Sequence, residues 1–235
     1  MLTVVLKYHE RLGDVLRCLP IARHLSLQGH EVLIECNQQY HSLFDVVSYA
    51  APVAPGRAPK AKLIDLQIWP NKYGEFRASN KSWADFVYGL VPGCEGMDRQ
   101  IVFDKLNPKS TVDEHILAPQ TAIVSPFGYS QTVRHNPALV SQYAFAKFGA
   151  PLRILADQAQ AEECIWRGWS EAVFITAKDI PELIRLLRDA REVMTINSAP
   201  AIICDVVRPH FYHILSGTAQ DDTITSKSRI VTFGP

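Results

Sequence analysis

The sequence predicts an α/β protein made of two Rossmann-like halves, each containing a parallel sheet. Short apolar runs alternate with segments of helical spacing along most of the chain. This alternation stops in a segment with two prolines and mixed charges, residues 105–119, and then restarts. The 235 residues suffice for two domains of roughly 100 to 120 residues each. We therefore expect an N-terminal half over 1–108, a linker over 109–120 and a C-terminal half over 121–235.

The N-terminal half opens with a strand–helix–strand pattern. Residues 3–7 and 31–36 are apolar runs typical of strands, and residues 14–28 between them show helical spacing and end before Gly29. This order predicts parallel strands joined by a right-handed crossover. Pro20 is expected to kink the helix or to divide it. The half continues with a helix near 40–48, a short strand near 52, a strand over 62–68 and a helix near 81–90 capped by Ser82.

The C-terminal half repeats the alternation. Its clearest helix is 179–190, because Asp179 suits the N-cap position and Pro181 the first turn. The other predicted helices are 137–149, 159–168 and 198–206, and the predicted strands are 121–125, 151–156, 172–176, 192–197, 210–215 and 229–233.

Composition excludes some classes of protein. Lysine plus arginine equals aspartate plus glutamate at 24 each, so an anionic partner must be met by a local patch. The five cysteines are scattered without a C-x-x-C pair, which favours reduced thiols over disulfides or structural zinc. The first apolar run is too short for a signal peptide or membrane span. We expect a cytoplasmic protein without an integral membrane segment.

The loops that follow the strands carry the candidate ligand-binding residues. Carboxyl ends of parallel strands meet at one edge of a sheet, and we expect the two edges to face a common cleft. Small hydroxyl residues, helix N-terminal amides and an arginine suit a diphosphate, and an acidic residue suits ribose hydroxyls. None of the loops contains a strict G-x-G-x-x-G. The candidates are Asp14 after the first strand, Gly128, Ser130, Thr132 and Arg134 after 121–125, Asp157 after 151–156, and Asn197, Ser198 and Ala199 after 192–197.

Each of these residues also has a purely structural interpretation. Asp14 and Asp157 stand where a helix begins, so each is also a candidate helix cap. Arg134 is equally interpretable as a solvated loop residue. His210 and His213 lie in a strand-like run and point to no zinc site.

Four stretches of the chain form a set that recurs in a known family: RLGDVLRCLPIARHLSLQGHEVLIEC, KLIDLQIWP, IVSPFGYSQTVRHNP and DIPELIRLLRDAREVMTINSAP. Together they resemble the ADP-heptose:lipopolysaccharide heptosyltransferase family, in a shortened form. The resemblance implies a GT-B fold and a metal-independent, inverting glycosyltransferase that uses a nucleotide-diphosphate sugar and no other cofactor. It further implies that Asp14 is the general base on the acceptor hydroxyl, and that Arg134, Ser198 and Ala199 lie at the donor phosphates.

The chain departs from that family before Asp14 and within the donor segment. The loop YHERLGD is bulkier than the family's serine-rich loop, and Ala199 stands where a glycine is typical. His9 is placed to assist Asp14 or to bind donor phosphate, and Glu10 is an alternative base. We group His9, Glu10 and Arg11 with the acceptor side.

Residues 57–83 interleave basic and aromatic side chains, among them Trp69, Lys72 and Arg77. Such a pattern suits an anionic saccharide as the acceptor. It equally suits DNA with hydroxymethylated bases, which similar phage enzymes glycosylate in the host cytoplasm. Both acceptors stay open. Two other functions also stay open: a non-catalytic module that binds a nucleotide sugar or nucleic acid, and a nucleotide-sugar epimerase. The sequence predicts no oligomeric state.

Overall fold

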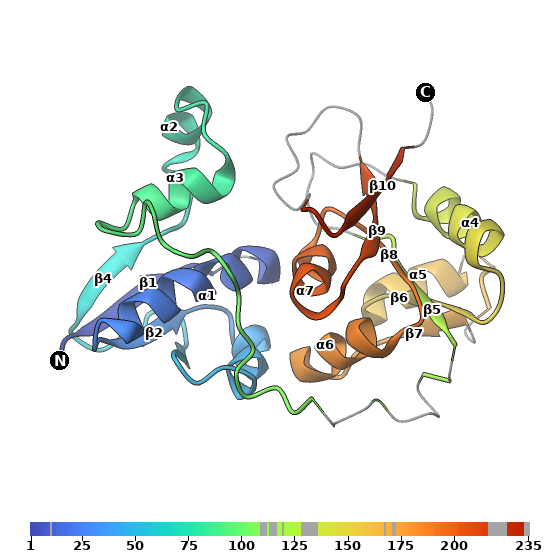
Figure 1. Cartoon of the computed structure of the whole chain (residues 1–235), viewed down its shortest axis with the longest axis horizontal. Helices are drawn as coiled ribbons and strands as arrows, with labels where there is room; N and C mark the ends of the chain where they lie inside the picture. Colours follow the sequence, from blue (N-terminus) through green and yellow to red (C-terminus); the bar gives the residue numbers. More distant parts are fainter. Residues whose placement is uncertain are drawn as a thin grey trace. The chain divides into compact units, whose positions relative to one another are not determined.

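The computed structural model describes residues 1–9, 11–108, 112, 117–118, 120–127, 136–166, 168–170, 173–215 and 225–232. The chain divides into two compact units, Met1–Leu106 (unit 1) and Asn107–Pro235 (unit 2) (Figure 1). Each unit holds one sheet whose described strands all pair in parallel. The predicted α/β fold with two parallel-sheet halves is therefore confirmed.

Unit 1 has the sheet order β3-β2-β1-β4, so the first strand lies inside the sheet. Val5 of this first strand pairs with Leu33 on one side and with Leu63 on the other. The elements are β1 (Thr3–Lys7), α1 (Leu12–Leu27), β2 (Glu31–Glu35), the 3-10 helix η1 (Gln38–Asp45), β3 (Ala51–Val53), β4 (Lys62–Asp65), α2 (Tyr73–Ala78) and α3 (Trp83–Gly89).

Helix α1 corrects two expectations. It begins at Leu12 with Arg11 as its N-cap, so Asp14 is the third helical residue and not the cap. It is also not divided at Pro20, because seven helical residues on its C-terminal side and the packing of its apolar face hold it together as one helix. The helix ends as predicted: Gly29 has φ +84°, and the amides of Gly29 and His30 donate back into the last turn.

Two smaller differences follow from weak local signals. The predicted helix near 40–48 is the 3-10 helix η1, shifted two residues toward the N-terminus. Helix α2 was not predicted, because its six residues are too few to show apolar periodicity. Ser82 does cap α3, as its side chain accepts the amide of Asp85.

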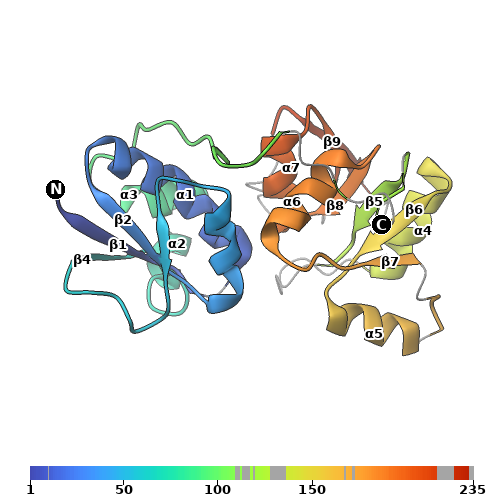
Figure 2. The same cartoon turned by 90° about the horizontal axis from the view of Figure 1, so that it is seen from below.

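Unit 2 has the sheet order β10-β9-β8-β5-β6-β7. Helices α4 and α5 lie on one face of this sheet and α6 and α7 on the other (Figures 1 and 2). The elements are β5 (Ala122–Ser125), α4 (Pro137–Phe148), β6 (Leu152–Leu155), α5 (Gln158–Trp166), β7 (Phe174–Ile175), α6 (Ile180–Asp189), β8 (Val193–Ile196), α7 (Ala199–Val207), β9 (Phe211–Leu215) and β10 (Ser228–Thr232).

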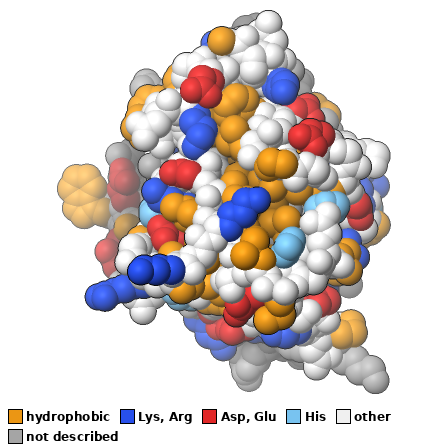
Figure 3. All heavy atoms as spheres, turned by 90° about the vertical axis from the view of Figure 1, so that its left-hand side faces the viewer, with side chains coloured by type: hydrophobic (Ala, Val, Ile, Leu, Met, Phe, Trp, Pro, Cys, Tyr) orange, Lys and Arg blue, Asp and Glu red, His pale blue; other side chains and the backbone are white. Residues whose placement is uncertain are grey.

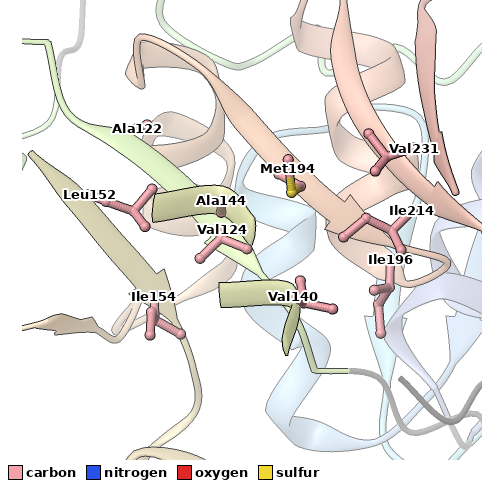
Figure 4. Close-up of a cluster of buried hydrophobic side chains, with 10 residues drawn as sticks. All are labelled: Ala122, Val124, Val140, Ala144, Leu152, Ile154, Met194, Ile196, Ile214 and Val231. Carbon is pink, nitrogen blue, oxygen red and sulfur yellow. The ribbon is translucent and has the colours of Figure 1, made fainter. Parts of the chain in front are cut away.

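The core of unit 2 follows from strand alternation. Alternate residues of the central strands point toward the face of the sheet that α4 covers. Together with the inner residues of α4 they form one apolar cluster (Figure 4). The cluster consists of Ala122, Val124, Val140, Ala144, Leu152, Ile154, Met194, Ile196, Ile214 and Val231, each at most 7% exposed. The cysteines are all free thiols, and Cys18, Cys36, Cys94 and Cys204 are buried.

No helix in the described ranges has both the length and the apolarity needed to cross a membrane.

Candidate functional site

Each sheet has one position where the order of its strands reverses. In unit 1 the chain runs from β1 outward through β2 and β3, then returns to the other side of β1 with β4. In unit 2 it runs from β5 through β6 and β7, then returns to the other side of β5 with β8. Loops diverge at such a point and leave a crevice beyond the strand ends, where doubly wound sheets bind ligands. The two candidate sites are therefore the β1/β4 and β5/β8 edges.

Asp14 lies beyond the β1/β4 edge, in the first turn of α1. The positive end of the helix dipole stabilises a carboxylate in that turn. Tyr8 directly follows β1, and its hydroxyl donates a hydrogen bond to the Asp14 side chain. The same hydroxyl accepts a hydrogen bond from Trp83, at the start of α3. Burial of the Tyr8 ring, and then the negative charge of Asp14, raise the pKa of Tyr8 far above its usual range. Tyr8 therefore stays a neutral donor to the Asp14 carboxylate.

Trp83 connects the predicted aromatic segment to this carboxylate. Its ring packs against Tyr8 with 5.8 Å between centroids, and the Arg17 guanidinium lies 5.0 Å from the centre of the Trp83 ring. Helix α3 is tied to α1 by a 3.2 Å hydrogen bond from the Tyr88 hydroxyl to the Arg17 carbonyl. Tyr8 and Trp83, which are 75 positions apart in the sequence, thus together form part of the surroundings of Asp14.

His9 and Glu35 form a close pair at the same edge. The His9 Nε2 and Glu35 Oε1 atoms are 2.6 Å apart, and the Glu35 residue is 5% exposed. The Tyr8 amide donates to the Glu35 carbonyl at 2.9 Å, which continues the β1–β2 pairing past the end of β1. The sequence placed His9 near Asp14, but it offered no sign of Glu35, which looks like the last polar residue of an ordinary strand.

Asp65 ends β4 and binds two lysines. Its carboxylate is 3.3 Å from Lys7 Nζ and 3.7 Å from Lys72 Nζ. Lys72 Nζ also donates to the Asp65 carbonyl at 2.8 Å and to the Gln67 carbonyl at 3.4 Å. Lys72, predicted to contact the acceptor, thus holds the loop after β4 through all of these contacts.

An aromatic pair follows this loop on the surface of unit 1. Trp69 is 58% exposed and Tyr73 is 40% exposed, with 5.0 Å between ring centroids in an edge-to-face arrangement. Arg77, the third predicted acceptor residue, is exposed in the last turn of α2. On the side of unit 1 at the left of Figure 1, basic, acidic and apolar side chains are interspersed, and no continuous basic surface is formed by the residues coloured there (Figure 3).

The β5/β8 edge carries the turn into α7. Ser198 is the N-cap, but its hydroxyl turns back toward β8, donating to the Ile196 carbonyl at 3.1 Å. Pro200 in the first turn has no amide hydrogen, so Ala199 contributes the outermost helical N–H. Asn197 immediately precedes this turn. The three predicted residues therefore lie together beyond β8, at the edge where the sheet order reverses.

Asp157 acts as a helix cap. Its carboxylate accepts the Gln160 amide at 2.8 Å, and the Gln160 side chain accepts the Asp157 amide at 3.0 Å. This reciprocal pair starts α5. Beside it, a cavity of about 290 Å³ lies between α4, α5 and the sheet, lined by the rings of Phe127, Trp169 and Phe174 and by the polar side chains of Asn136, Gln160 and Glu163.

Five predicted site residues lie outside the described residues: Glu10, Gly128, Ser130, Thr132 and Arg134. Within the described ranges, no group of three or more histidine, cysteine, aspartate or glutamate side chains has an arrangement that could hold a metal ion.

The sequence matches no protein-family model and no curated protein. The structure, however, resembles solved glycosyltransferases. A family 9 glycosyl transferase from Veillonella parvula is 11% identical with a TM-score of 0.63, over 99% of this chain and 85% of that one. Escherichia coli heptosyltransferase WaaC, solved with ADP-2-deoxy-2-fluoro heptose, is 12% identical with a TM-score of 0.62, over 97% and 92%.

A third similar structure is TibC, an iron-containing dodecameric glycosyltransferase from enterotoxigenic E. coli. It is 15% identical with a TM-score of 0.67, over all of this chain and 63% of that one. These likenesses confirm the predicted structural resemblance to heptosyltransferases and the GT-B-type fold.

Proposed function

We propose that the protein is an inverting glycosyltransferase that moves a sugar from a nucleotide-diphosphate sugar to an acceptor hydroxyl. The observation that carries the proposal is Asp14, a carboxylate at the β1/β4 edge that is held by a buried Tyr8. Its support is the fold, which the chain shares with heptosyltransferases over nearly its whole length.

Asp14 is the proposed general base. As the acceptor oxygen bonds to the anomeric carbon of the sugar, its proton passes to the Asp14 carboxylate. The bond from the anomeric carbon to the phosphate oxygen breaks on the opposite side, and its electron pair leaves with the nucleoside diphosphate. A carboxylate for the proton and amides or cations for the departing charge are what such a step requires.

Unit 2 is the proposed donor side. In our proposal the turn at 197–199 offers helix N-terminal amides to the diphosphate, and Gly128, Ser130, Thr132 and Arg134 also bind it. Asp157 binds ribose hydroxyls in this proposal. The ring-lined cavity beside it suits the flat apolar faces of a nucleobase.

A saccharide is the favoured acceptor over DNA. Lys7 and Lys72 both contact the Asp65 carboxylate, which balances one of their two positive charges. The exposed Trp69 and Tyr73 rings therefore follow a cluster of mixed charge. Exposed rings stack on the apolar faces of sugars, whereas duplex DNA requires many phosphate contacts. His9, Arg11 and Arg77 complete the proposed acceptor side.

The direct test is a thermal-shift panel of nucleoside diphosphates and their sugars. A ligand at a hundred times its Kd stabilises the native protein by about 2.7 kcal/mol, which raises the melting temperature measurably. The ligand that binds is then offered with oligosaccharides and with plain and hydroxymethylated DNA, and the products are analysed. Transfer to DNA alone would reverse the acceptor assignment. Binding without transfer or hydrolysis would favour a binding module, and a changed sugar without acceptor would indicate an epimerase.

Replacement of Asp14 by asparagine tests the base. Asp14→Asn keeps the size of the side chain and removes the proton acceptor, so we expect kcat to fall by about a hundredfold or more. The matched control is Asp45→Asn, an exposed carboxylate at the end of η1, for which we expect no change. If Asp14→Asn retains a rate within about threefold of wild type, Asp14 is not the base.

A further inference from the structure

The cavity between α4, α5 and the sheet of unit 2 has the size and lining of a site for one flat ring system. The rings of Phe127, Trp169 and Phe174 line it, and each is partly buried against the core of the unit. The centroids of the Trp169 and Phe174 rings are 6.2 Å apart, with 50° between the ring planes. The cavity volume of about 290 Å³ lies at the lower end of the roughly 300 to 1,000 Å³ usual for ligand pockets.

Direct contacts join this cavity to Asp157, the proposed ribose ligand. Gln160 lines the cavity, and its backbone N–H donates to the Asp157 carboxylate at 2.8 Å. The side-chain oxygen of Gln160 in turn accepts the Asp157 amide at 3.0 Å. The base of a nucleotide is bonded to its ribose, so a ribose at Asp157 brings the base to this cavity.

We propose that the cavity selects a pyrimidine base with two carbonyl groups, uracil or thymine, so that the donor is a uridine or thymidine diphosphate sugar. This inference rests on the proposed function and adds the base that the donor site recognises. The residues that recognise the base are Asn136, Gln160 and Glu163.

Helix caps determine which end of each side-chain amide is available to a ligand. The Asn136 oxygen accepts the Ala138 amide at 3.0 Å, at the start of α4, and the Gln160 oxygen accepts the Asp157 amide at the start of α5. Because both oxygens are engaged, the NH₂ group of each side chain is the part that binds a ligand, as a donor. Glu163 differs, because an ionised carboxylate only accepts. The lining thus offers two donors and one acceptor.

This set of donors and acceptors distinguishes the bases. Along the edge used in base pairing, uracil and thymine present two carbonyl oxygens with an N–H between them, which two NH₂ donors and one carboxylate complement. Adenine has an amino group and no carbonyl oxygen, and cytosine and guanine have one carbonyl oxygen each. These bases leave at least one NH₂ donor without an acceptor, which costs binding free energy in a largely enclosed site. The Ser141 hydroxyl also lines the cavity, but it serves as donor or acceptor and so does not discriminate.

The test measures the binding of UDP, TDP, CDP, GDP and ADP to the full-length protein by titration calorimetry. We expect UDP or TDP to bind at least about tenfold more tightly than ADP, and the comparison of UDP with TDP separates uracil from thymine. Asn136→Asp and Gln160→Glu keep the oxygen that caps each helix and replace the NH₂ donor by a second oxygen. We expect each variant to lower the ratio of UDP to ADP affinity about tenfold.

The affinity ratio is the readout because the added negative charge of each variant weakens all diphosphates alike. The matched control is Glu162→Gln, also on α5, whose carboxylate accepts the Gln158 side chain at 2.8 Å. For this control we expect the ratio to stay within about twofold of wild type. Melting curves verify that each variant is folded.

The outcomes separate this inference from the proposed function. Preference for UDP or TDP together with a lowered ratio in both variants supports the inference. Tightest binding of ADP, GDP or CDP, equal affinity for all five, or an unchanged ratio in both variants overturns it, while sugar transfer from whichever nucleotide binds still upholds the proposed function. If UDP or TDP binds as expected but its sugars are not transferred, the inference stands and the proposed function falls. If no diphosphate binds, both fall.

Discussion

At the scale of single residues, buried polar groups in this protein are matched to specific partners. Arg208 is 7% exposed, and its guanidinium donates to the carbonyls of Leu187, Ala190 and Arg191 at 2.7, 2.8 and 3.1 Å. These carbonyls belong to the C-terminal end of α6 and to the residues just after it, where helical partners are missing and the helix dipole is negative. Burial lowers the pKa of Arg208, yet the guanidinium stays charged because these acceptors surround it.

Loss of Arg208 should be costly. Arg208→Met keeps the apolar stem but leaves several buried carbonyls without a donor, so we expect the free energy of unfolding to fall by about 2 to 4 kcal/mol. Urea unfolding of Arg208→Met and of the control Arg185→Met, elsewhere on α6, measures this. Equal losses in the two variants would contradict the assigned role.

Two buried tyrosines, Tyr8 and Tyr88, and the half-buried Tyr49 predict sensitivity to alkaline pH. Burial raises the pKa of Tyr8, Tyr49 and Tyr88 above the ordinary value near 10. The folded protein keeps these side chains neutral above pH 10, whereas the unfolded chain ionises them. Their contribution to the free energy of unfolding is therefore fully present below pH 10 and is lost progressively as the pH rises above it. We expect each to contribute a slope of about −1.4 kcal/mol per pH unit above pH 10.

The tyrosine prediction is checked by urea unfolding between pH 9 and 11. Tyr49→Phe should make the slope shallower, since it removes one of the three groups, whereas Tyr143→Phe, at a partly exposed ring, should not. An unchanged slope in Tyr49→Phe would refute the assignment.

At the scale of elements, local sequence decides the helix ends more firmly than the strand ends. Asp179 accepts the Glu182 amide at 2.7 Å, and the Glu182 carboxylate accepts the Lys178 amide at 2.8 Å, so α6 begins where its sequence predicts. Gly29 ends α1 in the same self-contained way. The strand predicted over 62–68 instead ends at Asp65, whose side chain accepts the Gln67 amide at 3.0 Å.

The cap of α6 gives a quantitative prediction. Asp179→Ala removes the acceptor for the first-turn amide, and we expect the free energy of unfolding to fall by about 1 kcal/mol. Asp179→Asn keeps an acceptor and should cost little. Thermal unfolding of both variants distinguishes the cap from a general effect of charge, because only the alanine variant should melt earlier.

At the scale of the whole molecule, each unit carries candidate ligand-binding residues at the point where its strand order reverses. In unit 1 Asp14 lies in the first turn of α1, which follows the first strand, and in unit 2 the returning strand leads into Ser198 and Ala199. The proposed reaction uses amides, cations and carboxylates for each charge that develops, so it needs no metal ion.

Metal independence is therefore a prediction for the intact protein. After dialysis against a chelator, we expect the transfer rate to stay within about twofold of the untreated enzyme, with or without added magnesium. Inductively coupled plasma analysis of the purified protein checks for tightly held iron, the metal that TibC contains. A rate that is lost with the chelator and restored by one metal would overturn the prediction.

The sequence by itself determined the alternation of strands and helices, the C-terminal end of α1, the ends of α6, and the position of Asp14 beside the first strand. These features depend on residues close together in the chain, through apolar periodicity, caps and glycine conformation. It also carried the resemblance to heptosyltransferases, which the fold confirms.

Only the tertiary structure decided which distant side chains meet. It brought Trp83 to Tyr8 and Asp14, joined Glu35 to His9, and bound Lys72 to Asp65 instead of leaving it free for an acceptor. Parallel pairing is the physical reason, because it places the ends of β1, β2 and β4 at one edge although long segments separate them in the sequence.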